Sequence, residues 1–184
     1  MADWEGRLLV ATPLLSEGTF ARTVVQLLAH GEQDGAFGVV LNRPTETPLA
    51  DVLPGWALLA PDPAQVFDGG PVQESAAVCV ARIGLTATEP RGYVLVPGTP
   101  RLATVDLDLD AAPEVEQVRV FAGYAGWSPG QLEAEVEEGS WWVLDGLPSD
   151  VFTERPDLLW RQVLRRQGVP LAFAATHPGD PSLN

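Results

Sequence analysis

The sequence predicts an α+β fold, on three observations. Apolar runs of strand length recur along the chain, only two or three segments have the periodicity of a helix, and the two kinds of segment do not alternate as βαβ units would. The 18 Gly and 17 Pro are scattered, which indicates short elements joined by tight turns. The length suits one domain over residues 1–184, and we expect its core at about 6–168 and a tail at about 169–184.

The expected strands are short and mostly apolar. Runs 23–30 and 36–42 flank a polar Gly-containing segment, so a hairpin is the simplest interpretation. Pro44 should end this hairpin, because proline cannot donate to a ladder. Gly69-Gly70-Pro71 is expected to be a turn. The other strand candidates are Leu8–Ala11, 66–67, 78–83, 93–96, 118–121 and Trp141–Leu144.

Two helices carry clear signals, and residues 49–53 suggest a short helical turn. Ser128 and Gln131 have the spacing of a capping box, with proline between them at the favoured first helical position, and Gly139 should end that helix. A last helix is expected at about 156–167, where apolar residues form a stripe on one face before Gly168 and Pro170 close it.

The charge balance argues against direct binding to nucleic acid. The chain has 25 acidic residues and 11 basic ones, all arginine, for a formal net charge of -14. Nucleic-acid binding draws its affinity from phosphate contacts and needs a basic patch, which no segment supplies. The nearest approach to a basic cluster is Arg161, Arg165 and Arg166. Their better explanation is that positive side chains near the C-terminus of the last helix complement the negative end of its dipole.

A cytoplasmic location is expected. Cys79 is the only cysteine, so no internal disulfide can form, and its apolar surroundings favour buried packing over a reactive thiol. No stretch has the roughly 20 apolar residues that a membrane span needs. The first residues lack the basic start and apolar core of a signal peptide.

Common catalytic motifs are absent from the sequence. There is no G-x-S-x-G, Walker loop, H-E-x-x-H or C-x-x-C. One cysteine and two histidines cannot build a Cys/His zinc cage, although 25 acidic residues leave many carboxylate arrangements open. We therefore expect no cofactor and no metal, and a non-enzymatic role is favoured over an enzymatic one.

A candidate ligand site would gather polar residues at strand ends and turns. Arg43 could bind a carboxylate or phosphate through two parallel hydrogen bonds. The plainer alternative is that Arg43 pairs with one of the many acidic residues and that Asn42 hydrogen-bonds the turn backbone. His30 could be a general base, or it could make a hydrogen bond at a strand end. The complete set is Arg22, His30, Asn42, Arg43, Gly69, Gly70 and Pro71.

Three further residues have a plain structural interpretation. Trp127 precedes a helix N-terminus, which attracts anions, yet a core anchor for that helix is the better interpretation. Glu135 could face inward from the same helix, but a solvated face is expected. His177 lies in a Pro/Gly-rich tail and is expected to be solvated.

Several blocks together resemble the YqgE/AlgH family. Their order and spacing match from about residue 6 to 168, although the family's usual Asp before Phe20 and the Arg and Leu-His that often follow the Gly-Gly-Pro block are missing. The blocks are Gly6-Arg7-Leu8-Leu9-Val10-Ala11-Thr12-Pro13, Phe20-Ala21-Arg22-Thr23-Val24, His30-Gly31, Gly35 to Pro44, Gly69-Gly70-Pro71-Val72, and Gly123-Tyr124-Ala125-Gly126-Trp127-Ser128-Pro129-Gly130-Gln131-Leu132-Glu133 followed by Trp141.

The resemblance implies a fold and leaves the function open. It implies bent, mostly antiparallel sheets that form a pseudo-barrel, with two or three helices. It does not imply an enzyme, and one branch of the family is labelled a transcriptional regulator. We therefore expect a regulatory or protein-interaction role, with indirect transcriptional regulation as one form of it. The alternative is a small-molecule-binding protein or an enzyme of unknown reaction, with a polar site near Asn42 and Arg43.

Overall fold

The structure, a computed structural model, describes residues 3–84, 92–99, 101–110 and 114–176. His177 lies outside these residues. The described strands are β1 (Leu8–Ala11), β2 (Val24–Gly31), β3 (Gly35–Val40), β4 (Pro44–Pro48), β5 (Gln65–Asp68), β6 (Val72–Ile83), β7 (Tyr93–Leu95), β8 (Leu102–Val105), β9 (Val115–Trp127) and β10 (Trp141–Leu144). The described helices are α1 (Leu49–Val52), α2 (Pro54–Ala57), α3 (Gln131–Glu137), α4 (Pro148–Val151), α5 (Pro156–Arg166) and α6 (Leu171–Ala174).

The strands form one curled, mostly antiparallel sheet, which agrees with the expected α+β fold and pseudo-barrel. Its order is β10-β1-β2-β3-β9-β6-β8-β7, and β4 and β5 form a branch on β9. The pairing of β5 with β9 is parallel. Strand β9 joins the two halves of the sheet, because its last residues pair with β3 and its earlier residues pair with β5 and β6.

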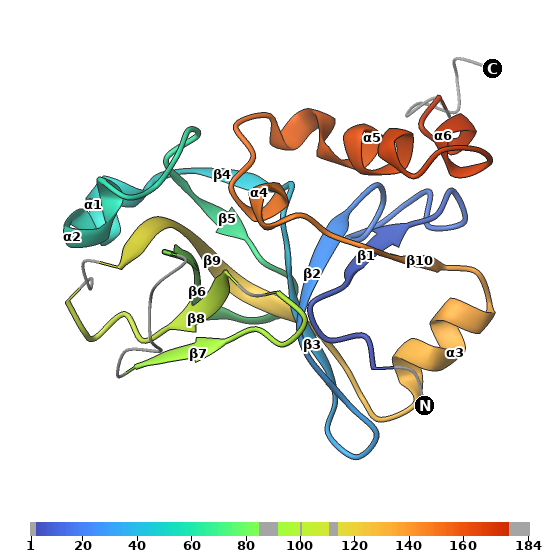
Figure 1. The fold of residues 1–184 in the computed structure, drawn as a ribbon, viewed down its shortest axis with the longest axis horizontal. Coiled ribbons are helices and arrows are strands. Elements are labelled where there is room, and N and C mark those ends of the chain that lie inside the picture. The colour runs from blue at the N-terminus through green and yellow to red at the C-terminus, as the bar shows by residue number, and fades with distance from the viewer. Residues whose placement is uncertain (1–2, 85–91, 100, 111–113, 177–184) are drawn as a thin grey trace.

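Both faces of the central strands are largely buried, and their sequences are mostly apolar, with Gln26 of β2 and Arg119 of β9 as buried polar exceptions. In β1, Leu8 and Val10 belong to an inner core beneath α4 and α5, whereas Leu9 and Ala11 pack toward α3. A third core lies between the other half of the sheet and α1–α2, and it includes Trp56. Figure 1 shows α5 and α6 along one end of the curled sheet, with α1–α2 and α3 at opposite sides.

Most predicted elements are present with corrected lengths, and strands β4 and β8 are additional. The hairpin of β2 and β3 is confirmed, and its ladder ends with Gly31 opposite Gly35. Pro44 begins strand β4 and pairs with Phe67 of β5, at a first strand position that tolerates proline. Strand β8 was not expected, and β6 and β9 are longer than the 78–83 and 118–121 runs suggested.

The helix count is six within the described residues, instead of two or three. The helices α1, α2, α4 and α6 have four residues each, too few to show an apolar period in the sequence. The capping box near Ser128 is half formed. The Gln131 side chain accepts a hydrogen bond from the Ser128 N–H (3.0 Å), but the helix begins at Gln131 after Gly130, whose φ is 76°.

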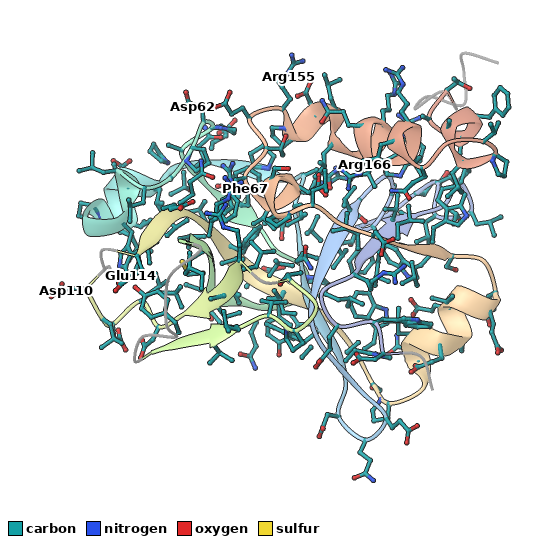
Figure 2. All side chains as sticks on the ribbon, viewed as in Figure 1. Asp62, Phe67, Asp110, Glu114, Arg155 and Arg166 are labelled. Carbon is teal, nitrogen blue, oxygen red and sulfur yellow. The ribbon has the colours of Figure 1, made fainter. Side chains whose placement is uncertain are left out.

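Arg119 of β9 ties three parts of the fold together. Its guanidinium donates to the carbonyl oxygens of Pro63 (2.7 Å), Thr153 (3.0 Å), Val151 (3.3 Å) and Pro61 (3.3 Å). The side chain is 1% exposed, and its Cζ lies 4.3 Å from the centroid of the Phe67 ring. Phe67 lies near the middle of the molecule (Figure 2) and belongs to the same core as Val151 of α4.

Burial lowers the Arg119 pKa to about 10, and the nearby Asp62 charge opposes that shift. The guanidinium therefore stays charged at neutral pH. A buried charge is stable only when its hydrogen bonds are satisfied, and here main-chain carbonyls satisfy them.

Replacing Arg119 with Met should destabilise the protein by about 2–4 kcal/mol, because the carbonyl oxygens of Pro61, Val151 and Thr153 lose their side-chain donor. Urea unfolding followed by tryptophan fluorescence measures this change. Arg155→Ala is the control, since Arg155 points outward (Figure 2) and its side chain is 62% exposed. Equal stability of the two variants would contradict the role given to Arg119.

Candidate functional site

Arg22, Asn42 and Arg43 meet at one corner of the sheet, where β2 begins and β3 has ended. Asn42 is 8% exposed. Its Oδ1 accepts a hydrogen bond from the Val24 N–H (3.0 Å), and its Nδ2 donates to the Arg22 carbonyl (2.9 Å). Arg22 has a φ of 56°, so the chain turns sharply as it enters β2. The amide of Asn42 thus fixes this turn, in agreement with the plainer sequence interpretation.

Arg43 contacts the main chain of the same corner. Its guanidinium donates hydrogen bonds to the carbonyl oxygens of Ala21 and Asn42. The sequence suggested an acidic partner for Arg43. Burial lowers the Arg43 pKa, and the charge of Asp68 raises it by a smaller amount. Asp68 therefore acts on the guanidinium through its charge. Asp68 also bonds to Arg43 through the main chain, from its N–H to the Arg43 carbonyl (2.8 Å).

The Gly69-Gly70-Pro71 segment reaches this corner from β5. The Gly69 carbonyl accepts from the Val40 N–H (2.9 Å), and the Gly69 N–H donates to Ala122 of β9 (2.9 Å). Gly70 has a φ of 143°, and a Cβ there would lie 2.3 Å from the Tyr124 carbonyl carbon. Glycine is required because two backbones approach closely, so the close approach is to β9 and needs no ligand.

Arg22 extends from the corner toward α5. Its Cζ lies 4.9 Å from the centroid of the Trp160 ring. Burial and, to a smaller degree, the charge of Arg161 lower the Arg22 pKa. The indole of Trp160 in turn donates to the Ala11 carbonyl (2.9 Å), which links α5 to β1.

His30 lies at the other end of β2, about 20 Å from the corner at about 3.3 Å per residue. Its side chain is 3% exposed and stacks on Trp4 with ring centroids 5.1 Å apart. Nδ1 accepts from the Trp4 N–H (3.3 Å), which puts the proton on Nε2, and Nε2 lies 3.0 Å from Glu133 Oε1. Both ring nitrogens are therefore engaged, and the partners come from the N-terminal segment and α3 instead of from the adjacent turn.

Glu135 is the clearest correction to the sequence analysis, which expected a solvated face. Its Oε2 accepts hydrogen bonds from the indole nitrogens of Trp127 (2.9 Å) and Trp141 (2.8 Å). Trp127 is buried, as expected of a core anchor. The sequence held a signal for this role. Glu135 lies four residues after Gln131, on the same helix face, and between two tryptophans in the sequence.

Cys79 is 2% exposed within the core beneath α1–α2. Burial raises the pKa of its thiol to about 12, so the thiol is protonated and unreactive at neutral pH. This agrees with the packing role expected from the sequence. Among the described residues, no cluster of three or more His, Cys, Asp or Glu could hold a metal ion.

An apolar hollow, hereafter the β6 cup, lies beside a register shift between β6 and β9. Its volume is about 530 Å³. The register shift falls between Val72 and Ala77. No local sequence pattern indicates this hollow. The lining residues are Thr45, Thr47, Val52, Leu53, Val66, Glu74, Ser75, Ala76, Ala77, Leu107, Asp108, Val120, Phe121 and Ala122.

The comparisons with known proteins identify the family. Residues 8–172 match the profile of the AlgH-like family, and the chain therefore belongs to that family. In the described part of the chain, no helix combines the length and apolar character that crossing a membrane requires.

Relatives and solved structures agree with this assignment. A UPF0301 protein of Streptomyces avermitilis is 51% identical over 97% of this chain and 94% of its own length. The UPF0301 protein of Mycobacteroides abscessus is also 51% identical, over 97% of this chain and 87% of its own.

Protein DIP2367 of Corynebacterium diphtheriae has a crystal structure that matches with a TM-score of 0.87 at 33% identity, over 96% of this chain and 93% of its own. The solution structure of the AlgH protein of Pseudomonas aeruginosa matches with a TM-score of 0.70 at 28% identity, over 97% and 96% of the two chains.

Asn42→Ala should lower the free energy of unfolding by about 1–3 kcal/mol, because it leaves the Val24 N–H and the Arg22 carbonyl without their side-chain partners. Asn42→Asp keeps the acceptor but loses the donor, so its free energy of unfolding should lie between those of Asn42→Ala and the parent protein. Urea denaturation of the three proteins gives this order. A parent-like midpoint for Asn42→Ala would show that the corner does not need the amide.

Proposed function

We propose that this AlgH-like protein is a non-enzymatic regulatory protein of the cytoplasm that acts through a protein partner. The observation that supports this best is the use made of its buried polar groups. Asn42, Arg43 and Arg119 direct their hydrogen bonds to main-chain atoms, and His30 engages both ring nitrogens with the fold. Groups engaged in this way position chain segments, and recognition then falls to the surface.

The surface charge suggests the chemistry of the partner. A net charge of -14 steers a basic protein surface toward this chain and repels a polyanion. Any effect on transcription would therefore be indirect. The cytoplasmic assignment is supported by the free, buried thiol of Cys79, which is typical of a reducing compartment.

Immobilised protein should capture a reproducible partner with a basic surface from an actinobacterial lysate, and the association rate of that purified pair should fall as salt is added. An unrelated protein of similar net charge is the control for simple ion exchange. Duplex DNA measured by fluorescence anisotropy should show no binding. The proposal fails if no protein is captured reproducibly, or if DNA binds tightly with a steep salt dependence.

A second candidate is a small-molecule-binding protein, or an enzyme of unknown reaction, with its site at the Asn42–Arg43 corner. It is favoured by one observation, the convergence of Arg22, Asn42, Arg43 and the Gly69–Gly70 backbone on that corner. His30 is remote from it and is not part of this candidate site.

For this second candidate, a thermal-shift screen of nucleotides, sugar phosphates and carboxylate metabolites should yield a hit that Arg43→Ala abolishes. A ligand at 100 times its dissociation constant adds about 2.7 kcal/mol of stability, enough to move the midpoint clearly. A flat screen, or a hit that Arg43→Ala leaves unchanged, would remove the candidate.

A further inference from the structure

The floor of the β6 cup is a patch of sheet with small side chains. Ala77 of β6 lies directly opposite Ala122 of β9, so the two share one face of the sheet. Val120 and Val66 belong to the same face, because side chains alternate along β9 and β5 pairs with β9 at Phe67 and Phe121. Two alanines in the middle of this floor leave room that larger residues would fill.

The backbone keeps the hollow open on one side. The ladder between β6 and β9 is interrupted between Val72 and Ala77, and Gln73 has a φ of 46°, which a non-glycine residue rarely adopts. Glu74 still packs against β9, since a Cβ on Gly123 would lie 3.1 Å from the Glu74 Cα, and residues 74–76 form one wall of the hollow. Val52 of α1 and the following Leu53 line the hollow from the other side.

The charge of the lining has a single sign. Glu74 and Asp108 are its ionisable residues, and no arginine is among the lining residues. Both carboxylates belong to exposed residues at the rim, whereas the floor is apolar. An anion entering the cup would meet two like charges, and a cation would meet two opposite ones.

We propose that the β6 cup binds a small molecule with an apolar body and a positively charged ammonium group. The body covers Ala77, Ala122 and Val120, and the ammonium lies between Glu74 and Asp108. A volume of about 530 Å³ suits a ligand of modest size, since small-molecule sites in proteins span roughly 300–1,000 Å³. This inference is independent of the proposed protein partner and of the Asn42–Arg43 corner.

Three probes with the same apolar body test the charge requirement. Phenethylamine, phenethyl alcohol and hydrocinnamate share a phenyl ring on a two-carbon chain and differ in carrying a cationic, neutral or anionic end. Isothermal titration at low ionic strength should rank them in that order, with the amine about tenfold tighter than the carboxylate. Equal affinities of the amine and the carboxylate, or no binding by any probe, would overturn the proposal.

Variants locate the binding. Ala77→Leu fills the floor at an exposed position and should abolish amine binding with an unchanged thermal midpoint. The double change Glu74→Gln and Asp108→Asn should remove the preference for amine over alcohol. Glu137→Gln, an exposed acid on α3 outside the cup, is the matched control and should bind like the parent.

Amine binding that survives Ala77→Leu, or selectivity that survives the double change, would also overturn the proposal. Capture of the protein partner should be unaffected by Ala77→Leu, so failure of this site and failure of the proposed function are told apart.

Discussion

The fold depends on one buried cation. Arg119 lies on the strand that both halves of the sheet share, and its donors reach carbonyl groups on the loop before β5, on the last residue of α4 and just after α4. Neither the loop nor this end of α4 pairs with β9 as a strand. The hydrogen bonds of the guanidinium therefore hold both segments in place against β9. The guanidinium also packs over the ring of Phe67, which belongs to the inner core.

The rest of the architecture follows from a sheet that is covered on both faces. Alternate residues of the central strands enter different cores, and each core has its own cover: α4–α5, α3, or α1–α2. The buried polar side chains bond within the fold: Asn42 and His30 do so at strand ends, and Gln26 and Arg119 do so inside strands. Glu135 does so from helix α3, where it accepts from two indoles. The β6 cup is the place where this double cover is incomplete, beside the register shift between β6 and β9.

The parts predictable from sequence were those with local patterns. Strands β1, β2, β3 and β10 are runs of apolar residues, and α5 has a clear stripe between Pro156 and Gly168, so each was found close to its true bounds. The end of β9 is made of Gly, Ala, Tyr and Trp and shows no alternation. Arg119 sits between Val118 and Val120, and its hydrogen-bond partners are 32 to 58 residues away, so no local pattern marks it. The β6 cup is assembled from separate segments for the same reason, whereas the main-chain role of Asn42 follows from its place at a strand exit.

The position of β10 affects how the chain can fold during synthesis. Strand β1 is bordered by β2 on one side and by β10 on the other, where Leu8 faces Leu144, and the Trp160 indole closes the contact by bonding to Ala11. A nascent chain therefore exposes one edge of β1 until Trp141–Leu144 has left the ribosome. Long-range pairing of this kind makes folding slow and leaves apolar edges open to other chains. Productive folding of this family member in the cell should depend on factors that shield the amino-terminal strands until β10 arrives.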